Sequence, residues 1–83
     1  MSTKLFVGSL PWSVNDNTLK QAFEKHGTVV SAKIVLDRDT KRSRGFGFVE
    51  MESNAEATKA IREMNDSTIE GRNIVVNLAK QRD

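Results

Sequence analysis

Residues 44–51 read Arg-Gly-Phe-Gly-Phe-Val-Glu-Met, and the predicted fold is built outward from this alternation of glycine and phenylalanine. Successive side chains of a β-strand point to opposite faces of its sheet. As a strand, this stretch places both phenylalanines on one face, with Arg44 and Glu50, and both glycines on the other. Because glycine weakens a strand, we interpret the glycines as allowing a helix to pack closely behind the sheet, with the rings on the open face.

A second aromatic strand is predicted near the start of the chain, where residues 5–10 read Leu-Phe-Val-Gly-Ser-Leu. If it pairs antiparallel with residues 44–51 and its aliphatic side chains point inward, Phe6 joins Phe46 and Phe48 on one outer surface. Grouped exposed aromatic residues usually mark a binding surface. Rings beside an arginine suit the unstacked bases and the phosphates of a single-stranded nucleic acid.

Both stretches resemble the signatures of the RNA-recognition motif (RRM) family. Residues 44–51 are similar to its longer signature, Lys/Arg-Gly-Phe/Tyr-Gly/Ala-Phe-Val-x-Phe/Tyr, and residues 5–10 are similar to its shorter, aliphatic-aromatic-aliphatic-x-Asn-Leu signature. Ser9 replaces the usual asparagine, and Met51 replaces the usual aromatic residue. By strand alternation, both side chains are expected to point inward. The resemblance covers about residues 3–80 and is closest to single-domain proteins of the short bacterial and glycine-rich plant types.

The other elements are predicted from hydrophobic periodicity. Strands are expected over about 4–9, 29–37 and 72–78 besides the central one, and helices over about 16–25 and 54–64. The helices would be capped by Asn15 or Asn17 and by Ser53 or Asn54. The residues expected to point inward are Leu19, Ala22, Phe23, His26, Ala32, Ile34, Ala57, Ala60, Ile61, Met64, Ile74, Val76 and Leu78.

This order of elements, βαββαβ, predicts an α+β, ferredoxin-like split βαβ fold. It would have a four-stranded antiparallel sheet with both helices on one face. The 83 residues predict a single domain over 1–83, with its core at about 3–80. In the family, the loop after the second strand often reads Asp-x-x-Thr-Gly-x-x-Arg-Gly. Lys41 replaces that first glycine, which is expected to cost turn stability because glycine adopts positive φ freely.

Composition narrows the class of protein. With no cysteine and one histidine, the chain cannot form disulfides and is a poor candidate for a metal site. The net charge is 13 − 11 = +2, but residues 38–44 carry a local +3 and residues 50–70 a local −4. Without an apolar run of membrane-spanning length or a signal-peptide core, we expect an intracellular, soluble protein, cytoplasmic in a bacterium and nuclear or cytoplasmic in a eukaryote.

The resemblance implies a single-stranded RNA site on the open sheet face and a post-transcriptional role. Phe6 and Phe48 would each stack a base, and Phe46 would contact the sugars between them. Asn77 and the main chain near residues 79–81 would read base edges. The remaining residues expected to hold phosphates or line the site are Lys4, Lys33, Arg38, Lys41, Arg42, Arg44, Lys80 and Gln81. We expect a monomer that uses no cofactor and no metal.

Several alternatives stay open at this point. Single-stranded DNA would stack equally well, because only contacts to the 2′-hydroxyl distinguish the sugars. A protein-binding domain of the family commonly lacks the outer aromatic residues, and an enzyme would need catalytic or phosphate-binding residues that this chain lacks. Trp12 could cover a base at the sheet edge or pin its loop to the second helix. Glu50 could repel phosphates or accept a hydrogen bond from a base.

Overall fold

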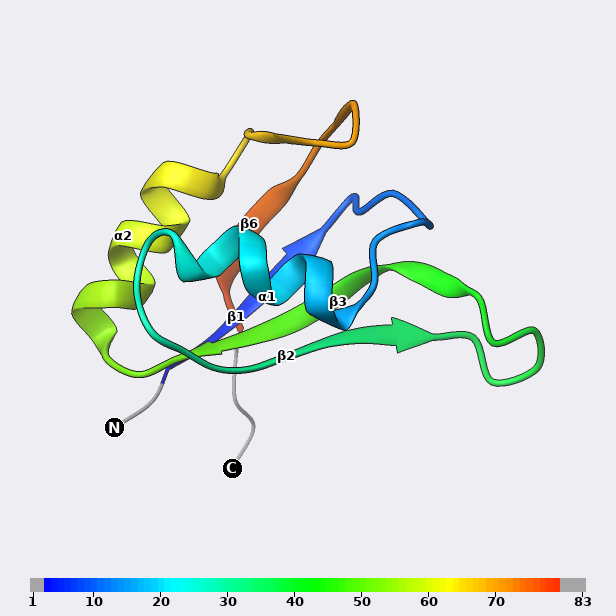
Figure 1. Cartoon of the computed structure of the whole chain (residues 1–83), viewed down its shortest axis with the longest axis horizontal. Coiled ribbons are helices and arrows are strands. Elements are labelled where there is room, and N and C mark those ends of the chain that lie inside the picture. The colour runs from blue at the N-terminus through cyan, green and yellow to red at the C-terminus, as the bar shows by residue number, and fades with distance from the viewer. Residues whose placement is uncertain (1–2, 80–83) are drawn as a thin grey trace.

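The computed structural model describes residues 3–79, except for the side chains of Ser43 and Arg44. Its main strands are β1 (Thr3–Gly8), β2 (Val29–Leu36), β3 (Ser43–Met51) and β6 (Val75–Leu78), and its helices are α1 (Asp16–Glu24) and α2 (Asn54–Met64). The strands form one antiparallel sheet in the order β2-β3-β1-β6. Both helices lie on the same side of this sheet (Figure 1). The predicted α+β, ferredoxin-like fold is confirmed.

The core lies between the helices and the inner face of the sheet. Leu5, Val7 and Val49 are fully buried there, as their parity predicts, and so are Leu19 and Phe23 of α1. Leu78 was expected to point inward, but it is 59% exposed. It is the last residue of β6, an edge strand with a neighbour on one side only, so the prediction for this residue is wrong.

The stretch predicted as one strand over residues 72–78 is interrupted. Thr68–Ile69 (β4) and Arg72–Asn73 (β5) form a separate hairpin, and the sheet strand begins only at Val75. The hairpin turn uses Glu70 at φ 49° and Gly71 at φ 85°, the positive values that a two-residue turn between twisted strands requires. A strand of two residues is too short to show a hydrophobic period, so periodicity does not predict this hairpin, and only Glu70-Gly71 marks its turn in the sequence.

The two glycines of β3 do not admit a helix, and that interpretation is wrong. A Cβ atom on Gly47 would lie 2.4 Å from the carbonyl oxygen of Lys33 and 3.1 Å from the Cα atom of Ile34, both in β2. Gly45 has φ 85°, and its carbonyl accepts a hydrogen bond of 2.8 Å from the Leu10 amide. Gly47 thus allows a neighbouring strand to approach, and Gly45 supplies a backbone conformation.

Two residues that replace the family's usual ones adopt left-handed conformations. Lys41 has φ 63° in the β2–β3 loop, where Asp37 accepts hydrogen bonds from the amides of Asp39 and Thr40 at 2.9 and 3.1 Å. Ser9 has φ 58° and is exposed, because β1 ends at Gly8. Its inward orientation was therefore predicted wrongly, whereas Met51 is fully buried as expected.

Lys41→Gly is expected to raise the free energy of unfolding by about 0.5–1 kcal/mol, because glycine avoids the steric cost of positive φ. Urea denaturation measures the change. Arg38→Gly in the same loop is the control, since residue 38 has no positive φ, and it should lower stability. Equal losses in both variants would contradict the argument.

Glu56 joins the start of α2 to the loop that follows α1. Its Oε2 atom accepts a hydrogen bond of 2.6 Å from the Thr28 amide, and its Oε1 atom accepts one of 3.0 Å from the Ser53 hydroxyl. Ser53 is the N-cap and accepts in return from the Glu56 amide at 3.2 Å. The Thr28 amide, followed by the Ser53 hydroxyl, holds the pKa of Glu56 below its ordinary value of 4.5.

This lowered pKa predicts a pH dependence of stability. Glu56 contributes stability that is fully present above its unfolded pKa near 4.5 and is lost as the pH falls through the lower folded pKa. Glu56→Gln should lower Tm at neutral pH, and the difference from the parent should shrink below about pH 4.5. Glu63→Gln on the exposed side of α2 controls for the lost charge. A difference that stays constant with pH would refute the assignment.

Candidate nucleic-acid interface

Phe6, Phe46 and Phe48 form one cluster on the sheet face that the helices leave open. The ring centroid of Phe6 lies 5.7 Å from that of Phe46 and 6.0 Å from that of Phe48. The centroids of Phe46 and Phe48 are 6.3 Å apart. The pairs are tilted or edge-to-face, with interplanar angles of 35°, 66° and 90°. All three side chains remain partly exposed, so the cluster offers ring surface to a ligand.

A row of four residues crosses the sheet through this cluster. Phe48 pairs with Phe6 in β1 and with Lys33 in β2, and Phe6 pairs with Asn77 in β6. Directly paired residues share a face, so an ammonium group flanks the two rings at one side and an amide at the other. The sequence placed these four residues on the open face, and the register brings them into one line.

The next row on this face pairs opposite charges. Glu50 pairs with Lys4 in β1 and with Ser31 in β2, whose hydroxyl lies 3.5 Å from its carboxylate. The ammonium of Lys4 lies 5.9 Å from the centroid of the Phe48 ring, within the range of a cation–π interaction. The Ala79 amide donates to the Lys4 carbonyl at 3.0 Å. The predicted main-chain contact at residue 79 therefore borders the same surface.

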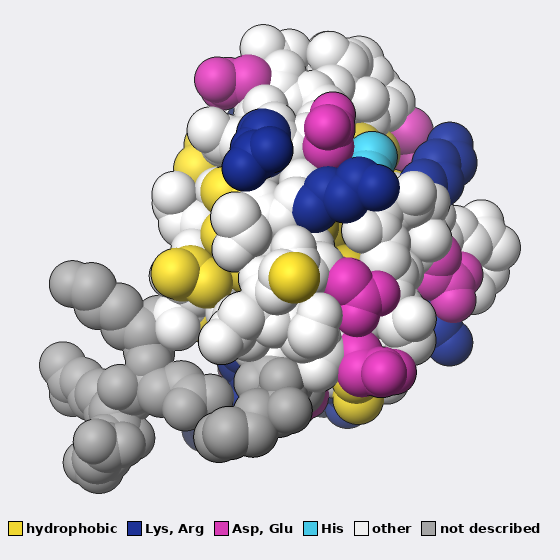
Figure 2. All heavy atoms as spheres, turned by 90° about the vertical axis from the view of Figure 1, so that its left-hand side faces the viewer, with side chains coloured by type: hydrophobic (Ala, Val, Ile, Leu, Met, Phe, Trp, Pro, Cys, Tyr) yellow, Lys and Arg dark blue, Asp and Glu magenta, His cyan; other side chains and the backbone are white. Residues whose placement is uncertain are grey.

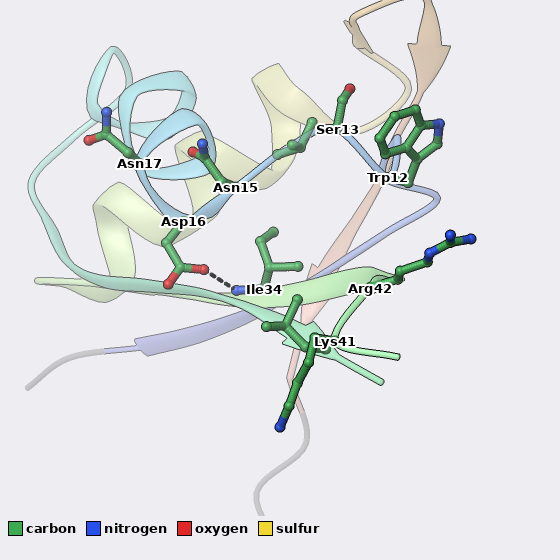
Figure 3. A pocket seen from close by; sticks show the side chains of 10 residues that line it. Trp12, Ser13, Asn15, Asp16, Asn17, Ile34, Lys41 and Arg42 are labelled. Carbon is green, nitrogen blue, oxygen red and sulfur yellow. Dashed lines mark hydrogen bonds between the residues drawn. The ribbon is translucent and has the colours of Figure 1, made fainter. Parts of the chain in front are cut away.

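The basic loop residues lie elsewhere. Exposed Lys41 and Arg42 line a groove of about 930 Å³ between the β2–β3 loop, the end of β2 and the segment from Trp12 to Asn17 that leads into α1 (Figure 3). Figure 3 shows Asp16 of α1 in this groove, accepting a hydrogen bond of 2.7 Å from the Ile34 amide at the sheet edge. Arg44 lies in β3, but its side chain is not described. Lys80 and Gln81 lie outside the described residues.

Sequence reasoning left Trp12 undecided and missed Arg72. Trp12 is 82% exposed, which contradicts one of its two alternatives, that it pins its loop to the second helix. It lines both the groove of Lys41 and Arg42 and a second hollow of about 480 Å³, which Phe6, Phe46 and Arg72 also line. Arg72 was counted as part of a long last strand, and only the position of the β4–β5 hairpin brings it here. The turn signal at Gly71 was its only trace in the sequence.

The acidic excess of residues 50–70 lies mainly in the helix layer. Glu52, Glu63 and Asp66, within and beside α2, are exposed. Figure 2 shows the side of the molecule around this helix, where acidic side chains are interspersed with basic ones near the single histidine. Because α2 lies on the covered face, most of these carboxylates are separated by the sheet from the aromatic cluster. The open face is the more favourable one for an anion.

Within residues 3–79, no cluster of three or more histidine, aspartate or glutamate side chains is arranged to hold a metal ion. No helix in the same described part is long and apolar enough to cross a membrane.

The comparisons with known proteins converge on one family. The model of the RNA recognition motif matches residues 5–75. A mitochondrial glycine-rich RNA-binding protein 4 of Arabidopsis thaliana is 51% identical over 99% of this chain and 60% of its own length. A chloroplast 28 kDa ribonucleoprotein of Nicotiana sylvestris is 49% identical over 95% of this chain and 29% of its own. The chain thus spans less than two thirds of the length of each of these relatives.

Solved structures extend the likeness to three dimensions. The crystal structure of RNA-binding protein PG1 superposes with a TM-score of 0.91 at 41% identity, over 98% of both chains. A Sex-lethal protein–RNA complex superposes with a TM-score of 0.87 at 37% identity, over 93% of this chain and 47% of that one.

Proposed function

The chain belongs to the RNA recognition motif family, and from this premise we propose that it binds single-stranded RNA on the open face of its sheet. The observation that carries the proposal is the cluster of three partly exposed rings, two of which, Phe48 and Phe6, lie in register between Lys33 and Asn77. The relatives named above are RNA-binding proteins or ribonucleoproteins, and one matching structure contains RNA. This is a family of binding domains, not of enzymes.

In the proposed complex, Phe48 and Phe6 each stack one base, and Phe46 contacts the sugars between them. Stacking contributes about 1–3 kcal/mol per base whatever the base, so these rings supply affinity. Lys33, in the row of Phe48 and Phe6, and Lys4, in the neighbouring row, hold phosphates. Asn77 reads a base edge. The other basic residues, Arg38, Lys41, Arg42, Arg44 and Lys80, add long-range attraction, and Gln81 is proposed as a base contact.

We place the protein inside the cell as a monomer that acts on RNA after transcription. The compartments given in the names of two relatives, chloroplast and mitochondrion, are also intracellular.

An NMR titration with random-sequence RNA hexanucleotides and matched DNA tests the proposal. With RNA, amide shifts should concentrate on the aromatic rows, and affinity should fall steeply with salt because counterions are released. A weaker response to DNA would show that the 2′-hydroxyl is read. The absence of shifts with either polymer at low salt would refute the proposal and favour a protein ligand.

A further inference from the structure

Trp12 is held in solvent by a turn whose two ends are anchored. Pro11 and Val14 are buried, and the Val14 amide donates a hydrogen bond of 3.1 Å to the Pro11 carbonyl. Trp12 and Ser13 occupy the two central positions of this turn. Among residues 3–79, Trp12 is the most exposed of the large hydrophobic side chains. The exposed indole is not isolated: it borders the same hollow as the partly exposed rings of Phe6 and Phe46, and grouped exposed aromatic residues usually mark a binding surface.

The hollow beside Trp12 is continuous with the aromatic cluster. Phe6 and Phe46 of the cluster line it, together with Trp12 and Arg72. Gly8 and Gly45 border it without side chains, which keeps it open. It is an open hollow of about 480 Å³, so one side of a bound group would stay in solvent.

A hydrogen bond joins the two segments that carry Trp12 and Arg72. The Ser13 hydroxyl donates to the Glu70 carboxylate at 2.7 Å, linking the turn to the β4–β5 hairpin. Glu70 is the only acidic residue of these two segments, residues 11–14 and 68–73, and its carboxylate accepts that bond. The bond holds the turn that carries Trp12 beside the hairpin that carries Arg72 before any ligand arrives, which lowers the entropy lost on binding.

We propose that this hollow is a subsite for one further nucleotide of the bound strand, with its base stacked on Trp12 and its phosphate held by Arg72. The inference rests on the proposed RNA-binding function and extends the site past the sheet. An aromatic ring beside a guanidinium suits a base and a phosphate together. Continuity with Phe6 and Phe46 allows the same strand to reach it from the sheet.

The indole itself reports occupancy, because Trp12 is the only tryptophan and the chain has no tyrosine. Random-sequence RNA hexanucleotides should quench its fluorescence with the same midpoint as the NMR shifts of Phe48. Trp12→Ala should weaken hexanucleotide binding about tenfold, as expected for one lost stack, and leave dinucleotide binding unchanged. Trp12→Phe, which keeps a ring, should restore most of the loss. Arg72→Ala should weaken binding and reduce its salt dependence.

Two controls match these variants. Val30→Ala removes an exposed apolar side chain at the opposite end of the sheet, and Arg62→Ala removes an exposed arginine from α2; neither should change affinity. Sheet shifts without indole quenching, or unchanged affinity in Trp12→Ala, would overturn the subsite and leave the proposed function intact. The absence of both sheet shifts and quenching would overturn the two together.

Discussion

Phe48→Ala is expected to weaken RNA binding about 5- to 150-fold while the domain stays folded. The ring would lose a base stack worth about 1–3 kcal/mol. It is partly exposed and lies between Lys33 and Phe6 in the row across the sheet, so its removal opens no sealed cavity. Isothermal titration calorimetry measures the affinity, and thermal unfolding measures the stability of the same variant.

Val49→Ala is the matched control from the next position of β3. Val49 points to the opposite face and is fully buried, so its truncation should cost about 1–3 kcal/mol of stability through lost burial. RNA affinity below the melting temperature should stay near that of the parent. If Phe48→Ala proved the more destabilising of the two, the assignment of the two faces would be incorrect.

Strand parity predicted that Phe48 and Val49 lie on opposite faces of the sheet. This prediction needs no knowledge of the partner strand, because side chains alternate along any single strand. Phe46 and Phe48 share a face in any strand that contains both. Placing Lys33 and Asn77 in line with them required the register as well. The inward aliphatic residues determine the register, since a slip by one residue would expose all of them. The main rows of the proposed site were therefore predictable.

The remainder depended on contacts between segments that are distant in the chain. The position of Arg72 follows from a hairpin of two-residue strands, which have no detectable period. The exposure of Trp12 follows from the burial of Pro11 and Val14 on either side of it. The role of Gly47 follows from how closely β2 approaches, and the sequence of β3 contains no information about that distance.

That approach makes Gly47→Ala the substitution with the largest expected effect on stability. The added Cβ atom would lie 2.4 Å from the Lys33 carbonyl oxygen, and backbone cannot rotate away as a side chain can. We expect a loss near the upper end of the range of about 1–3 kcal/mol for overpacked interiors. Because β2 is an edge strand, its displacement would also separate Lys33 from Phe48. Urea denaturation measures the first effect and RNA titration the second.

Gly8→Ala provides the control, because the same methyl group meets a different kind of neighbour. A Cβ atom on Gly8 would lie 2.9 Å from Cε1 of Phe6, a ring that can turn about its own side-chain bonds. Stability should therefore change by less than in Gly47→Ala, while the displaced ring lowers RNA affinity. Equal losses of stability in the two variants would show that crowding against backbone and against a movable ring costs the same here. Gly47 would then have no special role in letting β2 approach β3.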